Sequence, residues 1–517
     1  MNSKNLVLIL CLIFVIAGCK EPHAPTDLTK ENVIPIPVSI QATAEVFELT
    51  KETEIYVEGE DLLPIGEYLA NKLRPSTGFE FKVSATKEKP KSGNIYITTT
   101  GTDATLGDEG YELTITEDLV TLAAAKPAGA FRGVQTVRQL LPPASELTSV
   151  QKGPWEISTG TIRDYPTYEL RGAMLDVARH FFSVEDVKHY IDLIAGYKLN
   201  ALHLHLTDDQ GWRIEIKSWP NLATHGGSTQ VGGGKGGYYT QEQYKDIVKY
   251  AADRYITIIP EIDFPGHINA ALSSYPELNC NGKAPKLYTG TEVGFSTMCV
   301  GKEITFKFVD DVIRELSEIT PGPYIHLGGD ESHATKKKDF ITFVNKSQEI
   351  VISHGKHPIG WEEVAQGTLQ PGTVVQYWSN AEHAKVAAKN GSKMIMSPAK
   401  KVYLDMSYDS TTKLGLHWAA YIEVDSAYMW DPATIGEGIT QGNILGVESR
   451  LWSETLVKMD DIEFMAFPRI LGHAEIGWSP AAARNWDEYK VRLGKHGKRL
   501  EAKEINFYRS KLVPWTE

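Results

Sequence analysis

The sequence predicts an α/β protein in which a (β/α)8 barrel, or TIM barrel, follows a small α+β domain. Short runs with strand periodicity fill the first part of the chain, and two amphipathic stretches join them. After Asp164 the pattern changes, and apolar strands alternate with longer helical stretches. About eight strands follow, with helices between most of them, which favours a closed parallel barrel. An open doubly wound sheet is the alternative, but it usually carries a Gly-rich phosphate turn after its first strand, and none occurs here.

Residues 37–163 are expected to form the α+β domain. Alternating, β-branched runs predict its strands at 54–57, 94–98, 111–115 and 119–122. Helices are expected at 62–73 and 129–140, and the second ends before two prolines, which cannot continue a helix. This part of the chain contains no motif that indicates chemistry.

Residues 164–517 are expected to form the barrel. Its strands are predicted at 170–177, 200–206, 256–262, 324–327, 357–361, 374–378, 393–396 and 444–452. Its longer helices are predicted to follow Ser183, at 239–254, at 306–319 and at 340–354. Ser183 with Asp186, and Thr240 with Gln243, have the spacing of residues that cap the start of a helix.

The overall composition limits the class of protein. The chain is 42% hydrophobic and 23% charged, which excludes wholesale disorder and a protein with many membrane spans. The net charge of -13 argues against a nucleic-acid partner, because binding to phosphates needs clustered Lys and Arg.

The N-terminus predicts export. Residues 1–18 are interpreted as a lipoprotein signal peptide, because Lys4 precedes an apolar run that is too short to span a bilayer. Small residues precede Cys19, which looks like a bacterial lipobox, so we expect Cys19 to be lipidated and residues 19–36 to be a tether. The protein would then be exported to the bacterial cell envelope and held to the membrane by its lipid anchor only. A plain signal peptide cut nearby is the alternative.

The remaining cysteines suggest a disulfide. Cys11 lies in the signal core and Cys19 would be lipidated, which leaves Cys280 and Cys299 as a pair in an exported protein. A bond that closes this loop of about 20 residues would contribute about 3 kcal/mol of stability. Two buried free thiols are the alternative.

Carboxylates, aromatic rings and one arginine recur where the barrel strands end. In a (β/α)8 barrel the reacting residues lie at these ends. They are Arg179, Asp208, Asp263, His267, Asp330, Glu331, Trp361, Trp378, Tyr403, Asp405, Trp452 and Glu454. Carboxylates suit proton transfer, and aromatic faces stack on sugar rings. A phosphate site would need more cations.

A metal site was weighed against this interpretation. His203 and His205 share one face of a strand, and Asp208 and His267 are candidate partners. The histidine pair lies before the strand end, however, and later strand ends lack histidines. We therefore interpret the pair as barrel packing and expect no metal and no cofactor.

Five longer motifs resemble a known family, the family 20 glycoside hydrolases or β-N-acetylhexosaminidases. They are Arg171–Phe182, His203–Arg213, Pro260–His267, His326–Glu331 and Leu451–Glu454, and the similarity covers residues 168–454. The family has a small α+β domain before its barrel. Its bacterial members have a disulfide-bridged loop between the third and fourth strands, which Cys280 and Cys299 match.

The resemblance implies a role for each matching residue. The family departs from the usual two-carboxylate scheme, because the 2-acetamido oxygen of the substrate attacks the anomeric carbon to give an oxazolinium intermediate. Glu331 would be the acid/base, Asp330 would orient the acetamido group, Tyr403 would bind its oxygen, and Asp208 with His267 would support the Glu331 proton. Arg179, Asp405 and Glu454 would hold sugar hydroxyls, and Trp361, Trp378 and Trp452 would enclose the acetamido methyl and ring face. Trp418 is a further substrate-binding candidate, although Trp430 nearby competes for that assignment.

Two physical expectations concern the central pair. An ionised Asp330 should raise the pKa of Glu331 and keep it protonated near neutral pH. Adjacent strand residues point to opposite sides, so both carboxylates reach one sugar only if the chain turns at Glu331, after Gly328 and Gly329.

The sequence therefore predicts a retaining exo-β-N-acetylhexosaminidase whose partner is a glycan with a terminal β-linked N-acetylhexosamine. An enzyme of altered specificity, such as a lacto-N-biosidase or a 6-sulfo-GlcNAc-specific enzyme, is one alternative. A non-catalytic glycan-binding lipoprotein is another. The preference between GlcNAc and GalNAc and the oligomeric state stay open.

Overall fold

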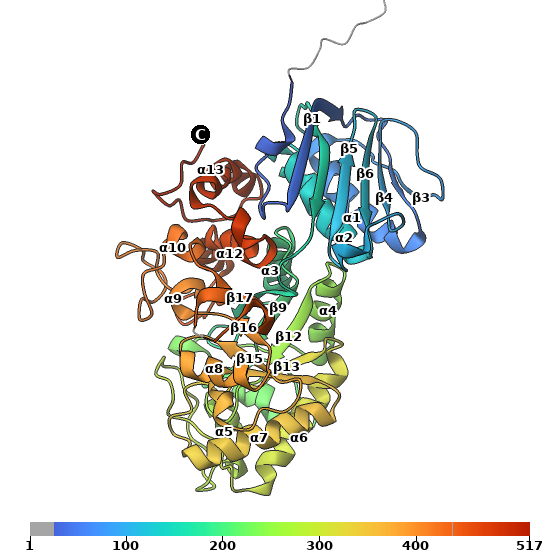
Figure 1. Ribbon diagram of the computed structural model, residues 1–517. Coiled ribbons are helices and arrows are strands. Elements are labelled where there is room, and N and C mark those ends of the chain that lie inside the picture. Colours follow the sequence, from blue (N-terminus) through green and yellow to red (C-terminus); the bar gives the residue numbers. More distant parts are fainter. Residues whose placement is uncertain (1–24, 437, 517) are drawn as a thin grey trace, which may run out of the picture.

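The computed structural model describes residues 25–436 and 438–516. The predicted signal peptide, residues 1–18, and the predicted lipidation site Cys19 lie outside the described residues. A sheet-containing domain at the N-terminal side lies beside a closed barrel (Figure 1). Within the described residues, no helix combines the length and the apolar character needed to cross a bilayer.

The first domain contains one mixed sheet of seven strands in the order β1-β7-β5-β6-β4-β2-β3. The strands are β1 (Ser39–Glu48), β2 (Ile55–Val57), β3 (Val83–Ala85), β4 (Asn94–Thr98), β5 (Tyr111–Ile115), β6 (Leu119–Ala124) and β7 (Glu156–Asp164). Helices α1 (Leu63–Thr77) and α2 (Pro127–Leu140) pack against this sheet. The β1, β7, β5 and β6 strands pair antiparallel, whereas β6, β4, β2 and β3 pair parallel.

Three strands of this sheet were not predicted, and helix α1 is longer than expected. Strand β1 shows no alternation because most of it is exposed and its register shifts between Ala42 and Val46. Strand β7 is almost continuously buried, and β3 has only three residues. Helix α1 continues through Pro75 to Thr77, beyond the expected end at Leu73.

The expected tether is wrong for its second part. Leu28, Val33 and Ile34 are fully buried in the main core. The backbone N–H of Ile34 donates to Gln139 Oε1 (2.9 Å), and that of Ile36 donates to Glu475 Oε2 (2.9 Å). Apolar residues between prolines were read as polar linker, but they pack against both the sheet domain and the barrel helices. A tether could only precede Thr26, whose backbone N–H donates to Ala44 O (3.1 Å).

The barrel confirms the predicted fold class. Eight parallel strands close in the order β8-β9-β12-β13-β14-β15-β16-β17. Their bounds are β8 (Leu170–Asp176), β9 (Ala201–His205), β12 (Thr257–Glu261), β13 (Tyr324–His326), β14 (His357–Trp361), β15 (Val374–Tyr377), β16 (Met394–Met396) and β17 (Ile444–Ser449). A short antiparallel hairpin follows β9, and each of its strands, β10 (Thr207–Asp208) and β11 (Gly211–Trp212), has two residues.

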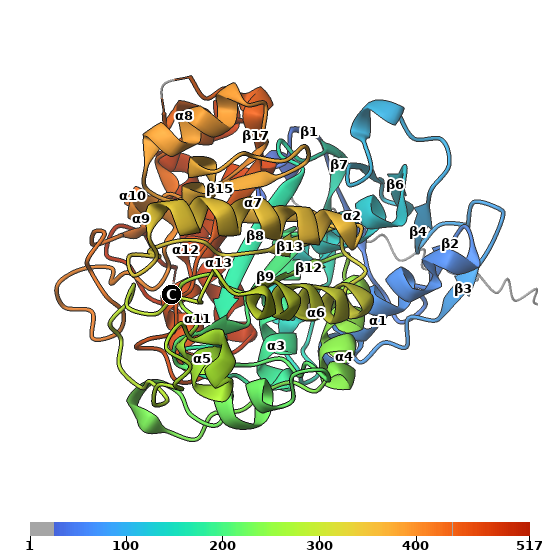
Figure 2. The ribbon, with the colours of Figure 1, turned by 90° about the horizontal axis from the view of Figure 1, so that it is seen from below.

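Helices surround this barrel. They are α3 (Val184–Ala195), α4 (Gln241–Ala252), α5 (Asn269–Ser274), α6 (Glu303–Ile319), α7 (Lys337–Ser353), α8 (Ala381–Lys389), α9 (Ala399–Val402), α10 (Val424–Tyr428), α11 (Met459–Ala466), α12 (Arg469–Trp478) and α13 (Trp486–Ala502). Figure 2 shows α6 and α7 side by side across the barrel. The helix caps predicted at Ser183 and Thr240 are both present. After β14 a 3-10 segment, Glu362–Gln366, replaces the usual helix.

Candidate active site

A tight turn after β13 brings Asp330 and Glu331 to one place. Gly328, Gly329 and Glu331 have positive φ angles of 66°, 103° and 42°. A Cβ atom on Gly328 would lie 1.8 Å from Asp263 Oδ1, so only glycine fits there. The Gly329 N–H donates to the same oxygen at 3.0 Å. The expected turn at Glu331 is confirmed, and it lets two sequence neighbours line one pocket.

That pocket has a volume of about 220 Å³ and opens at the carboxyl ends of the barrel strands. Its lining residues are Arg179, Thr291, Val293, Asp330, Glu331, Trp378, Tyr403, Leu416, Trp418, Trp452 and Glu454. Trp361 and Asp405 are buried and are not part of this lining, but Trp361 packs with Tyr403 and Trp452 directly beside it. The structure thus brings the predicted carboxylates, arginine and aromatic residues together.

Asp208 and His267 lie next to the Asp330–Glu331 pair. Asp208 Oδ1 lies 3.3 Å from His267 Nδ1. The other ring nitrogen, Nε2, lies 3.6 Å from Glu331 Oε2 and 3.8 Å from Asp330 Oδ2. His267 itself has a positive φ of 48°, next to the turn that follows β12. The geometry aligns Asp208, His267 and Glu331 in series.

The predicted direction of the Glu331 pKa is wrong. Burial raises the pKa of the Glu331 carboxyl, but His267 and Arg179 outweigh burial and hold the pKa below its ordinary value. His267 is cationic because Asp208 and Asp330 outweigh its burial and hold its pKa well above the ordinary value. The proton is instead held more tightly by Asp330, whose pKa is raised mainly by burial. The sequence argument considered Asp330 alone and missed the neighbouring cations.

Arg179 is fixed at one end of the pocket. Its Nη2 lies 2.8 Å from Asp208 Oδ2, and its Nη1 lies 3.4 Å from Asp176 Oδ2. The guanidinium carbon lies 4.8 Å from the Trp452 ring centroid. Asp176 also accepts the backbone N–H groups of Ala178 and Arg179, so it shapes the turn after β8.

Aromatic rings form a compact wall that begins at Trp452, beside Arg179. Trp361 and Tyr403 have ring centroids 6.0 Å and 6.3 Å from that of Trp452. Trp418 packs edge-on against Trp378 and Tyr403. Trp418 is 58% exposed and lies at the mouth, whereas Trp430 donates its indole N–H to Ala427 O and lies outside the lining. The structure therefore places Trp418, and not Trp430, in the pocket.

Trp378 is held from two sides by adjacent carboxylates of the 3-10 segment after β14. Glu362 accepts the backbone N–H groups of Trp378 and Ser379, and Glu363 Oε2 accepts the Trp378 indole N–H at 3.2 Å. Burial raises the pKa of Glu362 to about 7. These contacts fix one wall of the pocket.

Several buried polar atoms around the pocket have no hydrogen-bond partner within the described part of the chain. They are Asp330 Oδ1, both carboxylate oxygens of Asp405, Glu454 Oε2 and Arg179 Nε. Buried polar atoms are normally satisfied, so such a cluster indicates groups kept for a polar ligand. Burial, reinforced by Glu454, raises the pKa of Asp405 well above its ordinary value. Burial also keeps the Tyr403 phenol neutral by raising its pKa, so its hydroxyl can donate.

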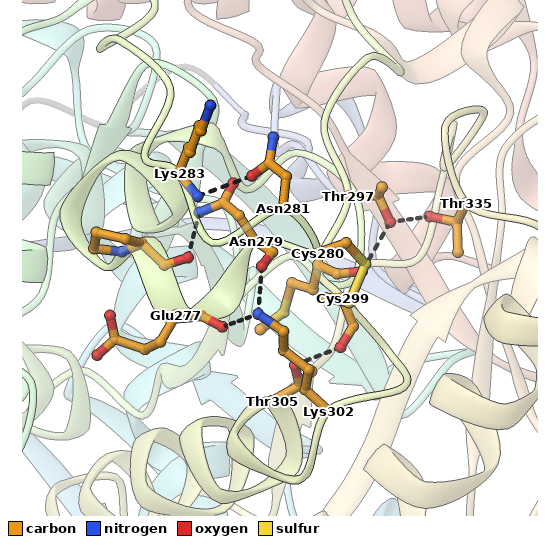
Figure 3. Close-up of a disulfide and its surroundings, with 12 residues drawn as sticks. Glu277, Asn279, Cys280, Asn281, Lys283, Thr297, Cys299, Lys302, Thr305 and Thr335 are labelled. Atoms are coloured by element: carbon orange, nitrogen blue, oxygen red, sulfur yellow. Dashed lines mark hydrogen bonds between the residues drawn. A yellow bond between two sulfur atoms is a disulfide. The ribbon is translucent and has the colours of Figure 1, made fainter.

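A disulfide-closed loop supplies one side of the mouth. The predicted bond between Cys280 and Cys299 is confirmed (Figure 3). Lys302 Nζ donates to the Glu277 and Asn279 carbonyls beside it, and Thr297 bonds to Thr335 across the loop (2.7 Å).

Barrel residues dock the same loop. Ser296 Oγ donates to Asp209 Oδ1 (2.6 Å), and Gln210 Nε2 donates to Gly290 O (2.9 Å). These contacts place Thr291 and Val293 in the pocket lining.

The interpretation of His203 and His205 as packing is incomplete. Both rings bond to the buried Glu261 carboxylate, and His205 also bonds to Asp208. Groups of carboxylates and histidines here have spacings that could hold an ion. However, Arg450 Nη1 lies 3.0 Å from His203 Nδ1, and a cation this close disfavours a metal at that group.

Sequence reasoning missed several residues of the site. Thr291, Val293 and Leu416 lie in loops without periodicity, and only the cysteine pair indicated that the first of these loops was structured. Asp263, which fixes the turn, stood in the recognised Pro260–His267 motif but received no role. Asp176 at the end of β8 was hidden inside an apolar run.

Comparison with known families gives two matches that cover most of the chain. A model described as the catalytic domain of glycosyl hydrolase family 20 matches residues 168–481. A model described as domain 2 of the same family matches residues 30–165.

Characterised relatives agree with these matches. The chain is 39% identical to a beta-N-acetylhexosaminidase from Cellulomonas fimi over 93% of this chain and 97% of that protein. It is 35% identical to a beta-hexosaminidase from Porphyromonas gingivalis over 96% of this chain and 67% of that protein.

Solved structures share the whole architecture. The GH20 beta-N-acetylhexosaminidase from Streptomyces coelicolor A3(2) superposes with a TM-score of 0.92 at 50% identity, over 96% of this chain and 100% of that chain. A mutant beta-hexosaminidase from Streptomyces plicatus, in complex with its product GlcNAc, superposes with the same TM-score at 51% identity, over 96% of this chain and 99% of that chain.

Proposed function

This chain belongs to glycosyl hydrolase family 20, and on that premise we propose that it is a retaining exo-β-N-acetylhexosaminidase. It removes terminal non-reducing N-acetylhexosamine from glycans by substrate-assisted catalysis. One observation carries the proposal: buried Asp330 Oδ1 accepts no N–H or hydroxyl group of the described residues, while Glu331 in the same turn remains partly exposed at the pocket. Asp330 is thus suited to accept the amide N–H of the substrate, and Glu331 is suited to protonate the leaving group.

The acetamido group of the substrate occupies the aromatic end of the pocket. Its N–H donates to Asp330, and its carbonyl oxygen accepts from the neutral Tyr403 hydroxyl. Trp361, Trp378 and Trp452 enclose the methyl group. Held in this way, the carbonyl oxygen lies close to the anomeric carbon and attacks it, which makes the reaction intramolecular. Asp330 stabilises the positive charge that develops on the oxazolinium nitrogen.

Glu331 handles the proton. It protonates the glycosidic oxygen as the bond breaks and then takes a proton from the water that opens the oxazolinium ring, so the configuration is retained. His267 and Asp208 lie behind it and set its charge environment. The competent form of the pair has Asp330 ionised and Glu331 protonated. The neighbouring residues of the chain disfavour that form, and the amide N–H of the substrate favours it by stabilising ionised Asp330.

The end of the pocket beside Arg179 accounts for exo action, the removal of terminal sugars only. Arg179, Asp405 and Glu454 bind the hydroxyls of the terminal sugar with polar atoms that have no hydrogen-bond partner among the described residues. Their side chains close that end, so a chain cannot continue beyond the sugar. Trp418 and Val293 at the mouth contact the group that leaves.

A panel of chromogenic β-glycosides tests the proposal. We expect release from the GlcNAc or GalNAc glycoside and none from the matched glucoside, which lacks the acetamido nucleophile. Glu331→Gln should remove most of this activity. Preferred release from a 6-sulfated GlcNAc glycoside or a lacto-N-biose glycoside would assign one of the altered specificities. No release from any of these glycosides would contradict the proposal and favour a glycan-binding protein.

We infer separately that the protein is exported and held to the cell envelope by a lipid on Cys19. The apolar run and the small residues before Cys19 support this. Labelled palmitate should be incorporated in the native host and lost in Cys19→Ala, which should appear in the soluble fraction. Equal labelling of both forms would contradict lipidation at Cys19.

A further inference from the structure

We propose that Glu261 is a positioning residue that fixes the proton-transfer group and the acetamido pocket of this site together. The proposal rests on the function given above. Glu261 is the last residue of β12, is completely buried, and touches neither the pocket nor the reacting pair. One carboxylate oxygen, Oε2, bonds to His205 on the side of the proton-transfer residues, and the other, Oε1, bonds to Trp361 in the wall of the acetamido pocket.

We call the two series of contacts that start at the Glu261 oxygens its arms, and the first arm leads from Oε2 to Glu331. Glu261 Oε2 lies 2.5 Å from His205 Nδ1, and the other ring nitrogen of His205 lies 3.0 Å from Asp208 Oδ2. Asp208 continues to His267 and so to Glu331. With a carboxylate at each ring nitrogen, His205 donates from both and carries a positive charge. Burial lowers the pKa of His205, but Glu261 and Asp208 outweigh it and raise that pKa to about 9.

This arm fixes the orientation of the Asp208 carboxylate, and so decides which of its oxygens faces His267. Asp208 Oδ2 is shared between His205 and Arg179, which leaves Oδ1 for His267. If His205 lost its charge, Asp208 would lose one of its cationic partners, and both its orientation and its charge would be less firmly set. The effect would reach Glu331 through His267.

The second arm runs toward the acetamido pocket. Glu261 Oε1 accepts the indole N–H of Trp361 at 2.9 Å. Trp361 is 1% exposed, and Arg450 stacks on its other side with the guanidinium carbon 4.0 Å from the ring centroid. The indole plane is therefore fixed by one hydrogen bond and one stacked cation. Its orientation decides where the acetamido methyl fits.

One carboxylate thus accepts from three side chains: His203 and His205 at Oε2, and Trp361 at Oε1. A carboxylate offers enough lone pairs for all of them, whereas an amide offers acceptors on only one side. Glu261→Gln keeps the shape but must turn its NH₂ toward one arm. At Oε2 it would force His205 into a neutral tautomer, and at Oε1 it would leave the Trp361 N–H without an acceptor.

The experiment compares Glu261→Gln with wild type using two readouts. The first is kcat for a 2,4-dinitrophenyl glycoside, whose phenolate leaves without a proton, against kcat for the phenyl glycoside, which needs Glu331. The second is the inhibition constant of a thiazoline that mimics the oxazolinium intermediate. We expect kcat to fall about 10-fold or more for the phenyl glycoside and less for the dinitrophenyl glycoside, with weaker thiazoline binding. A general loss of stability would change both substrates equally.

Single-arm variants separate the two effects and keep the test valid if Glu261→Gln does not fold. His205→Gln should reproduce the leaving-group-dependent loss with little change in thiazoline binding. Trp361→Phe removes the indole N–H and part of the acetamido wall, and it should weaken thiazoline binding with little leaving-group dependence. Glu315→Gln is the matched control, because it changes a buried carboxylate that binds the Lys217 and Ser218 backbone away from the site.

The outcomes are distinct. If Glu261→Gln, or both single-arm variants, keep wild-type ratios between the two substrates and wild-type thiazoline affinity, the proposal is overturned. If wild type itself releases nothing from either N-acetyl glycoside, the proposed function fails first. Selective losses in the Glu261 series beside an unaffected Glu315→Gln would establish the positioning role.

Discussion

Gly328 has no space for a side chain because Asp263 occupies it: a Cβ atom would lie 1.8 Å from Asp263 Oδ1. The same oxygen accepts the Gly329 N–H, so the carboxylate anchors the turn that carries Asp330 and Glu331. The catalytic pair depends on a contact made by a residue of another strand end.

Gly328→Ala should therefore damage catalysis more than stability alone explains. The methyl group would force Asp263 away and strain a φ of +66°. We expect kcat to fall by about 100-fold or more, since a displacement of about 1 Å in a reacting group has such an effect. Steady-state kinetics together with a melting curve check this. Normal kcat would show that Asp263 moves freely and that the turn does not depend on it.

Asp330→Asn should lower kcat by about 100- to 1,000-fold, because the site loses the charge that stabilises the oxazolinium nitrogen. The substrate should still bind, so KM should change less. Rates for wild type and variant on the same GlcNAc glycoside measure the effect. Turnover near the wild-type rate would remove Asp330 from its assigned role.

His267→Gln should move the pH profile of kcat/KM to higher pH. The active form needs Asp330 ionised and Glu331 protonated, so activity is highest at an intermediate pH, and the pKa values of these two groups together set the two limbs of the profile. The His267 cation lowers the pKa of both groups. Without the His267 cation both pKa values rise, so both limbs of the pH profile move to higher pH. The rate itself also falls. Limbs that stay in place or shift downward would contradict the electrostatic assignment.

Asp405→Asn should weaken activity but stabilise the free protein. Burial and Glu454 raise the Asp405 pKa, so this group makes the folded state less stable as pH rises from its ordinary pKa toward the folded-state value. An uncharged side chain removes that cost, and we expect a gain of about 1 kcal/mol at neutral pH. A lost hydroxyl contact should lower kcat/KM by a factor of about 10 to 100. Melting at pH 5 and 8 checks the first claim, which a lower melting temperature at pH 8 would contradict.

Much of this fold could be read from local patterns. The eight barrel strands were located within a few residues because buried parallel strands are short apolar runs between capped helices. Strands β1 and β7 were missed because neither has the alternation of a half-buried strand, and they pair with each other across more than 100 residues of chain. The segment around Ile34 likewise depends on partners distant in sequence, because Ile34 bonds to Gln139 and Ile36 bonds to Glu475.

The site shows the same division. Residue types at strand ends predicted the ring of carboxylates and tryptophans, and two glycines predicted the turn. The direction of the Glu331 pKa was wrong because His267 and Arg179 reach it from other strands, and sequence order gives no distance between them. The contacts of Glu261 could not be predicted from the sequence either, since its three hydrogen-bond partners come from strands β9 and β14.

The central claim is that the substrate supplies the nucleophile, and the most direct measurement changes that nucleophile alone. Aryl GlcNAc glycosides whose acetamido methyl carries none, one, two or three fluorines form a series in which the carbonyl oxygen becomes steadily less nucleophilic. The account predicts that kcat falls steeply along the series while the aryl leaving group stays the same. Rates that do not depend on fluorination would contradict it and would require a nucleophile from the protein.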